Sequence, residues 1–255
     1  MGQGHLHRLH RPGDTVIHRL PPQTKLVALF AFVVLVVLTP REAFWAFGAY
    51  ALLLTAVVAL AEIPSRVVAR RALVEVPFVL FAVLLPFVTP GPEVEVLGLS
   101  LSTEGLLGAW NILAKATLGV VASIVLAATT EPRSLLLGLE RLRLPSMLVQ
   151  IASFMLRYAD VILGEMERMR VARESRGFHA RHLGQARVLA QSAGALFIRA
   201  YERGERVHLA MLSRGYTGTM PVLDSVGATT REWTTALVLP AAALVVAASA
   251  WVVTR

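Results

Sequence analysis

The chain has 255 residues, of which 55% are hydrophobic and only 16% are charged, and its mean hydropathy is +0.61. It nevertheless carries a formal net charge of +8, with 25 basic and 17 acidic residues. A soluble domain of this size cannot bury so much apolar sequence in one core, and a disordered chain would not contain it. The absence of cysteine excludes disulfides, thiolate catalysis and cysteine-ligated metals. The composition therefore predicts an all-α, polytopic integral membrane protein, whose positive charge lies outside the bilayer.

Five apolar runs are long enough, or nearly long enough, to cross a bilayer, which takes about 20 residues. In chain order they are 25–39, 43–61, 72–89, 106–129 and 234–253. The first run is short and needs its flanks to complete a crossing. The third contains two prolines, which either kink the helix or are ordinary membrane-helix prolines. We expect about five transmembrane helices, within a range of four to six, and an uncleaved first span because no small-residue cleavage site follows it.

The basic residues predict the orientation of these spans. Basic residues precede the first run, arginines follow the second, and 15 arginines lie between residues 131 and 231. The segment after the third run carries three glutamates and no basic residue. Because cytoplasmic loops are rich in Lys and Arg, we expect the N-terminus and residues 131–231 in the cytoplasm, and residues 89–104 and the C-terminus outside. This arrangement places 22 of the 25 basic residues on the cytoplasmic side of the cell membrane.

The segment 131–231 is too long and too helical in pattern to be a simple connecting loop. From Ser146 to Gly177 an apolar half is followed by a charged half, which predicts one long helix, and a second is expected from about Leu183 to Arg214. The predicted organisation is a cytoplasmic N-terminal tail, four transmembrane helices, a cytoplasmic coupling domain of two or three helices, and a C-terminal transmembrane helix. These parts cover residues 1–24, 25–130, 131–231 and 232–255.

A short motif occurs twice, each time at the end of one of these long helices. Residues 172–178 read Ala-Arg-Glu-Ser-Arg-Gly-Phe, and residues 210–216 read Ala-Met-Leu-Ser-Arg-Gly-Tyr. A glycine just past a helix end adopts the left-handed cap conformation at little cost, and arginine suits the negative end of the helix dipole. Each copy would hold a guanidinium at a helix tip, beside an aromatic ring. Arginine and aromatic side chains anchor protein interfaces, and arginine can grip a carboxylate with two parallel hydrogen bonds.

Ser-Arg-Gly is also a common way to end a helix, so one copy alone would carry little information. Two copies on cytoplasmic helices predict a partner with two equivalent pockets, of which a dimer of subunits is the simplest form. The predicted docking residues are Ser175, Arg176, Gly177, Ser213, Arg214 and Gly215.

The chain resembles the transmembrane T component of energy-coupling factor (ECF) transporters, and within them the cobalt-type CbiQ branch. The resemblance is most specific in residues 157–178 and 197–218, with support from residues 18–26, 77–86 and 128–145. In that family two cytoplasmic coupling helices end in arginine-centred motifs, which insert into grooves on a pair of ABC-type ATPases. The resemblance assigns that role to the two Ser-Arg-Gly copies, although many relatives have alanine where this chain has serine.

The resemblance implies the energy-coupling subunit of an importer for cobalt or nickel ions. Its partners would be two ATPase subunits and a substrate-binding membrane S component, with or without a small accessory membrane subunit. The sequence agrees, because it contains no G-x-x-x-x-G-K-[ST] phosphate loop, no H-E-x-x-H and no G-x-S-x-G. We therefore expect a non-catalytic subunit without a cofactor, whose energy comes from the partner ATPases. Nucleic-acid binding is not indicated, because topology and docking explain the arginines.

Histidines and an intramembrane lysine carry weaker predictions. His5, His7 and His10 could bind Ni²⁺ or Co²⁺, but a solvated tail is the favoured interpretation, and no metal site is assigned. Lys115 lies inside the fourth apolar run. It is either a functional charge at membrane depth or a side chain that extends to the membrane boundary.

Charged residues on the two long helices are predicted to brace them against each other. Arg157 and Asp160 are three residues apart and share a face of the first helix, and Arg203 and Glu205 lie on the second. The alternative function is a membrane scaffold that recruits a cytosolic partner through the same helical arms without transport. Detergent pull-down separates the two hypotheses, because a transporter requires two nucleotide-binding subunits and a second small membrane protein.

Overall fold

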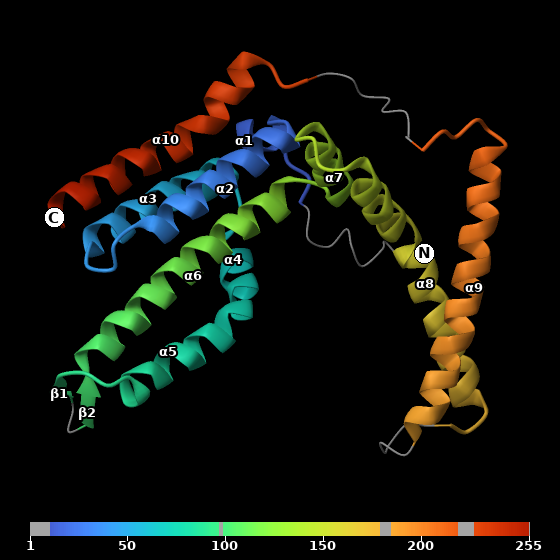
Figure 1. Ribbon diagram of the computed structural model, residues 1–255, viewed down its shortest axis with the longest axis horizontal. Coiled ribbons are helices and arrows are strands. Elements are labelled where there is room, and N and C mark those ends of the chain that lie inside the picture. The colour runs from blue at the N-terminus through green and yellow to red at the C-terminus, as the bar shows by residue number, and fades with distance from the viewer. Residues whose placement is uncertain (1–10, 97–98, 179–184, 219–226, 255) are drawn as a thin grey trace. The chain divides into compact units, whose positions relative to one another are not determined.

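The computed structural model describes residues 11–96, 99–178, 185–218 and 227–254. The chain divides into two units. We call the first the membrane bundle, which comprises His7–Leu142 and Gly227–Arg255, and the second the helix pair, which comprises Arg143–Val226. Most of the described residues are helical, which confirms the predicted all-α class (Figure 1).

The membrane bundle has a helix for each apolar run of the sequence, together with shorter helices outside these runs. They are α1 (Val16–Arg19), α2 (Pro22–Leu38), α3 (Phe44–Leu60), α4 (Ser65–Ala72), the 3-10 turn η2 (Leu73–Glu75), α5 (Val76–Val88), α6 (Thr103–Thr129), α7 (Pro132–Arg141) and α10 (Thr230–Val253). In the part of the chain that is described, four helical stretches are long and apolar enough to cross a membrane: Ser65–Val88, Thr103–Thr129, Ser146–Ser175 and Thr230–Val253. Both α2 and α3 are apolar but have only 17 residues each. The chain is therefore a multi-pass membrane protein.

The core of the bundle lies where α2, α3, α6 and α10 meet. The rings of Phe32 on α2 and Tyr50 on α3 are both fully buried and pack edge to face, with centroids 5.9 Å apart. The Tyr50 hydroxyl lies 2.9 Å from Thr39 Oγ1, so this buried polar group has a partner. On α10 the buried residues are small and recur every three or four positions: Ala236, Pro240, Ala243, Ala247 and Ala250. Small residues let helix backbones approach closely in a membrane, which explains how α10 packs against α2 and α3.

Helices α5 and α6 are joined through a β-hairpin, whereas the sequence predicted only a connecting loop there. Strands β1 (Glu93–Val96) and β2 (Leu99–Ser102) pair antiparallel, with Glu93 opposite Ser102. The Ser102 hydroxyl then caps α6 by accepting a hydrogen bond from the backbone N–H of Gly105 at 3.3 Å. This hairpin leads the chain directly from α5 into α6, and the two helices pack against each other along the bundle (Figure 1).

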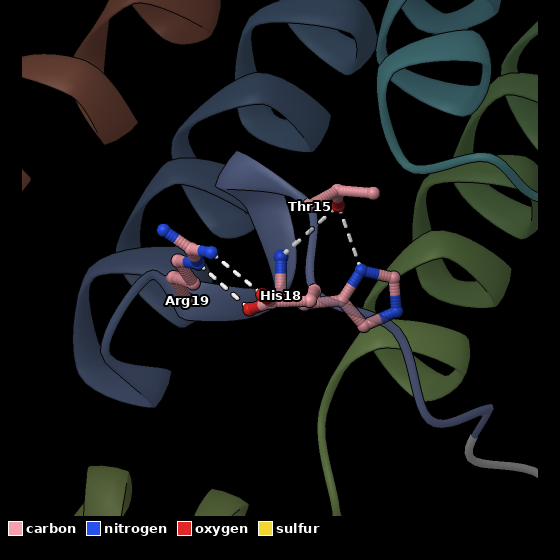
Figure 2. A network of polar contacts seen from close by, with 4 residues as sticks. Thr15, His18 and Arg19 are labelled. Atoms are coloured by element: carbon pink, nitrogen blue, oxygen red, sulfur yellow. Dashed lines mark hydrogen bonds and ion pairs between the residues drawn. The ribbon is translucent and has the colours of Figure 1, made fainter.

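The described part of the predicted N-terminal tail packs against the end of α6. The backbone N–H of Arg11 donates to the carbonyl of Ala128 at 2.9 Å. Figure 2 shows the turn that follows, in which Thr15 caps α1 and its hydroxyl lies 2.7 Å from His18 Nδ1. Hydrogen bonds and the positive charge of Arg19 lower the pKa of the Asp14 carboxyl from its ordinary value. The first apolar helix, α2, begins at Pro22, three residues before the predicted boundary.

The helix pair consists of α8 (Ser146–Ser175) and α9 (Ala186–Leu212), which lie side by side (Figure 1). Both long helices predicted for this region are thus confirmed. Val149 is the buried residue of α8, and α9, which is described throughout, buries none. Large apolar side chains such as Met155, Phe197 and Tyr201 are exposed instead. The pair therefore presents most of its apolar surface to its surroundings rather than to a core of its own.

Candidate functional site

The first Ser-Arg-Gly copy forms the C-terminal cap of α8. Gly177 has a φ angle of +76°, a left-handed conformation that costs glycine little. Its N–H donates to the carbonyl of Glu174, and the N–H of Phe178 donates to the carbonyl of Arg173, both at 3.0 Å. These two bonds form a Schellman motif, which satisfies carbonyls that the helix end would otherwise leave free.

The second copy builds the same cap at the end of α9. Gly215 has a φ angle of +81°. The N–H of Gly215 donates to the carbonyl of Leu212, and the N–H of Tyr216 donates to that of Met211, again both at 3.0 Å. The left-handed glycine that the sequence predicts at each helix end is therefore present twice, in the same hydrogen-bonded frame.

Each tip exposes both its serine and its arginine, but the serine hydroxyl is already hydrogen-bonded within the helix. Ser175 Oγ donates to the carbonyl of Val171 at 2.7 Å, and Ser213 Oγ donates to the carbonyl of Ala210 at 3.0 Å, so both hydroxyls have partners within their own helix. Arg176 and Arg214 are exposed, whereas the aromatic residue that follows each glycine is half-buried. Each tip can therefore offer a guanidinium to a carboxylate on another molecule.

A polar contact at the end of α9 shows that the two helices run antiparallel. The hydroxyl of Tyr216 hydrogen-bonds to Gln150 Oε1 near the start of α8, and Gln150 Nε2 donates to the carbonyl of Gly218 at 2.9 Å. Because Tyr216 follows the second tip, that tip lies beside the beginning of α8. The first tip lies at the other end of α8, so the two arginines are found at opposite ends of the helix pair.

An ion pair joins the middle of α8 to the middle of α9. Arg203 Nη2 lies 3.1 Å from Glu165 Oε1, and the two side chains are only 34% and 14% exposed. Glu165 and Arg203 both belong to the charged residues predicted to brace the two helices, but the sequence did not pair them with each other. Within the described ranges Arg157 and Asp160 do not form an ion pair with each other, and both are exposed, as is Glu205. Their bracing role stays a prediction.

Comparison with known proteins decides the family. A family model described as cobalt transport protein, CbiQ, matches residues 13–223, which is most of the chain. The chain belongs to the CbiQ family. The match includes both arginine tips and the bundle helices from α1 to α7, whereas α10 lies beyond the matched residues.

Similar proteins carry the names of ECF transporter components. The EcfT transmembrane protein of Limosilactobacillus fermentum is 30% identical over 80% of this chain and 81% of its own length. The EcfT protein of Thermosediminibacter oceani is 29% identical over 81% of this chain and 82% of its own length. The cobalt transport protein CbiQ of Rhodobacter capsulatus is 29% identical over 65% of this chain and 66% of its own length. The predicted membership in the ECF T-component family is confirmed.

The buried lysine at the start of α2 closes the C-terminus of α6. Lys25 Nζ donates to the carbonyls of Thr129 at 2.9 Å and His18 at 3.2 Å, and to Thr130 Oγ1 at 3.2 Å. Helix ends leave carbonyls without intrahelical partners, and these carry the negative end of the dipole. Lys25 of this CbiQ-family chain therefore supplies both the donors and the charge that the end of α6 requires.

Lys115 makes the reverse connection, from α6 to the C-terminal end of α2. Its Nζ donates to the carbonyl of Val37, in the last turn of α2, at 2.8 Å and lies 6.0 Å from the centre of the Phe47 ring. Trp251 on α10 donates its indole N–H to the neighbouring carbonyl of Leu38 at 3.2 Å. The structure thus gives Lys115 a specific carbonyl partner within the bundle. His5, His7 and His10 lie outside the described residues.

Proposed function

We propose that this chain is the energy-coupling T subunit of an ECF-type importer, and that two ABC-type ATPase subunits dock on the tips of α8 and α9. The observation that carries the proposal is that both copies of the motif build the same cap and expose the same arginine. Two equal tips suit two equal pockets, and a pair of identical subunits provides them. The names of the relatives, which are ECF transporter components, support the same assignment.

Each arm also exposes an aliphatic side chain near its tip. Val171 and Leu209 are 54% and 60% exposed and each lies five residues before the arginine of its tip. Arginine is enriched among interface hot spots, and the contacts around a hot spot exclude water from it. The pocket on the ATPase would therefore combine an apolar groove with a carboxylate.

Coupling follows from the rigidity of the two arms. Helices α8 and α9 are continuous over 30 and 27 residues, so displacement of a tip is carried along the whole arm. When the ATPases close on ATP, their pockets move, and the arms transmit this movement toward the membrane helices. These in turn act on a separate membrane S component, which binds the transported solute. In this scheme the chain hydrolyses no ATP itself, and its N-terminus and the helix pair lie in the cytoplasm.

We propose cobalt or nickel ions as the transported solute. The support is the description of the matching family as cobalt transport proteins and the name of the Rhodobacter capsulatus relative. Uptake of radioactive Co²⁺ and Ni²⁺ into cells that express the complete complex measures this choice directly. Uptake of neither ion by a complex that hydrolyses ATP would contradict the proposed solute but not the coupling role.

Charge reversal at the tips tests the docking. Arg176→Glu and Arg214→Glu each place a negative charge before the expected carboxylate, and loss of a charge pair of this kind weakens binding by about 2–5 kcal/mol. We expect co-purification of the ATPases to fall at least tenfold, and ATP-dependent uptake to be lost, while the chain still inserts into the membrane.

Arg168→Glu and Arg206→Glu are the matched controls. These arginines are also exposed, and they lie on the same two helices, each eight positions before the arginine of its tip. A general effect of negative charge on the helix pair would reduce docking in the control variants as well. Normal uptake by the double variant Arg176→Glu/Arg214→Glu would contradict the docking proposal.

A further inference from the structure

The similarity between the two arms extends further back than the Ser-Arg-Gly motif. When the two motif copies are aligned, Glu167-Arg168 on α8 corresponds to Glu205-Arg206 on α9, and Ala172 corresponds to Ala210. At the start of this correspondence, Glu165 corresponds to Arg203. These two residues have opposite charges, and they form the ion pair between the helices.

Burial follows the same correspondence at every position from 165 to 178 and from 203 to 216. The half-buried residues of α8 in this stretch are Glu165, Met169 and Arg173, and those of α9 are Arg203, Val207 and Met211. The remaining helical positions of both stretches are exposed, and the aromatic residue after each glycine is half-buried again. Since the two helices are antiparallel, equal burial along both arms fits an approximate two-fold arrangement of α8 and α9.

The ion pair lies at the centre of this symmetry. Arg176 follows Glu165 along α8 at the same sequence separation as Arg214 follows Arg203 along α9. At a helical rise of about 1.5 Å per residue, each tip lies about 16 Å from the ion pair, in opposite directions. A slip of α9 along α8 by one turn would move the tips by about 5 Å relative to each other. The register of α9 against α8 therefore sets the distance between the two tip arginines.

The ion pair is held by one hydrogen bond rather than two. Glu165 Oε1 accepts from Arg203 Nη2, whereas Glu165 Oε2 and Arg203 Nε are buried without a hydrogen-bond partner. A partly satisfied, half-buried pair contributes little to net stability compared with apolar side chains of similar volume, and the best-attested use of such pairs is to specify register. A single contact also lets the helices change their crossing angle without breaking it.

We propose that Glu165 and Arg203 are a positioning pair. This pair, which lies midway between the two arginine tips, fixes the register of α8 against α9, so that both tips reach their pockets at the same time. The proposal rests on the docking function proposed above, but the register itself can be measured without the ATPases.

The register is measured as a distance between spin labels on the full chain in lipid nanodiscs. The chain contains no cysteine, so Ala172→Cys and Ala210→Cys introduce two unique labels at equivalent, exposed positions on the two arms. Pulsed electron spin resonance gives the distance distribution between them. We compare this background with three variants, Glu165→Arg, Arg203→Glu and the double exchange, and with the milder Glu165→Gln in case the reversals do not accumulate. ATPase recovery and uptake are measured on the same variants without the cysteines.

Each single reversal places two like charges side by side between α8 and α9, at positions 165 and 203. We expect the mean distance to shift by about 5 Å, or the distribution to widen by as much, because the helices slip or separate. ATPase recovery should fall about tenfold, and the double exchange should restore both the narrow distribution and the recovery, as contacting partners do in a double-mutant cycle. The control is Glu202→Gln, which removes an exposed carboxylate that pairs with Arg206 within α9 and should change neither quantity.

Two results would overturn the positioning pair. One is an unchanged distance distribution in Glu165→Arg and Arg203→Glu, or in Glu165→Gln if only that variant accumulates. The other is a double exchange that restores neither the distance nor the recovery. The distances could instead respond as expected while reversal of the tip arginines leaves uptake intact. That result would support the role of Glu165 and Arg203 in fixing the register, and would contradict the docking function.

Discussion

At the scale of single residues, the two lysines among the 25 basic residues of this chain, Lys25 and Lys115, have the same structural role. Each donates to carbonyls at the end of the helix that carries the other. Because Lys25 lies beside Thr129 and Lys115 beside Val37, α2 extends along only part of α6. The carbonyls at the end of α2 therefore lie beside the middle of a membrane helix, where water is scarce and every backbone group needs a partner.

Replacing either lysine by methionine should destabilise the membrane bundle. Lys115→Met leaves the carbonyl of Val37 without its donor, at a cost of about 1–3 kcal/mol. Lys25→Met removes the donor to two carbonyls and one hydroxyl, so we expect the larger loss there. For a chain of this size a loss of about 1 kcal/mol shifts Tm by about 3 °C, which thermal unfolding in detergent detects.

Lys115→Arg serves as the control for this prediction, since it keeps the positive charge and several N–H donors. Its loss of Tm should be less than half that of Lys115→Met. Equal Tm values for the wild type and both methionine variants would show that water or lipid satisfies these carbonyls.

The sequence predicts those residues whose role is decided locally. The left-handed glycines at positions 177 and 215 follow from the order of residues at a helix end, and both are present. Glu165 could not be paired with Arg203 from the sequence alone, because the contact depends on how two helices cross. The separation between the two motif copies can be read from the sequence, and the same separation relates Glu165 to Arg203. That relation indicates a contact only when the two helices are known to run antiparallel. The carbonyl partner of Lys115 was hidden for the same reason.

At the scale of elements, apolar runs predict helices well and their ends less well. All five runs are helical, and the two long helices of the helix pair lie close to their expected bounds. The third run proved more complex, because Pro77 stands in the first turn of α5 and a 3-10 turn joins that helix to the charged α4. The alternation Glu-Val-Glu-Val opposite Leu-Ser-Leu-Ser is a strand signal. The segment was nevertheless predicted as a loop, because its glutamates were used only to predict the orientation of the spans.

The packing of α5 against α6 depends on a glycine near the start of α6. A Cβ atom on Gly105 would lie 2.6 Å from Pro86 Cα and 2.8 Å from the carbonyl oxygen of Leu85, both of which are backbone atoms that cannot rotate away. We therefore expect Gly105→Ala to cost about 1–3 kcal/mol, as overpacking does. The midpoint of thermal unfolding measures this loss.

Gly119→Ala is the matched control for the packing prediction. Gly119 lies in the same helix, and a Cβ atom there would meet nothing within 4 Å. Alanine is the better helix former by about 1 kcal/mol, so this variant should be neutral or slightly more stable. If Gly105→Ala behaved like Gly119→Ala, close contact between α5 and α6 at Pro86 would be disproved.

At the scale of the whole molecule, the topology depends on which helical stretches cross the membrane. Length and composition qualify Ser146–Ser175 as a span, although its second half is strongly charged. The charge distribution instead favours a cytoplasmic α8, because 15 arginines lie between residues 131 and 231. The two topologies differ in parity, since an additional crossing at α8 would place its C-terminal end, with Arg176, on the face opposite to that of its N-terminal end.

Labelling of single cysteines in whole cells distinguishes the topologies, because the natural chain has no cysteine. Glu95→Cys lies in the β-hairpin and Arg170→Cys on the charged half of α8, and both side chains are exposed. In the predicted topology a membrane-impermeant maleimide labels Glu95→Cys in intact cells, and labels Arg170→Cys only after the membrane is opened. Thr254→Cys, at the end of α10, should behave like Glu95→Cys. Labelling of Arg170→Cys in intact cells would make α8 a membrane span, and an ATPase in the cytoplasm could then not reach Arg176.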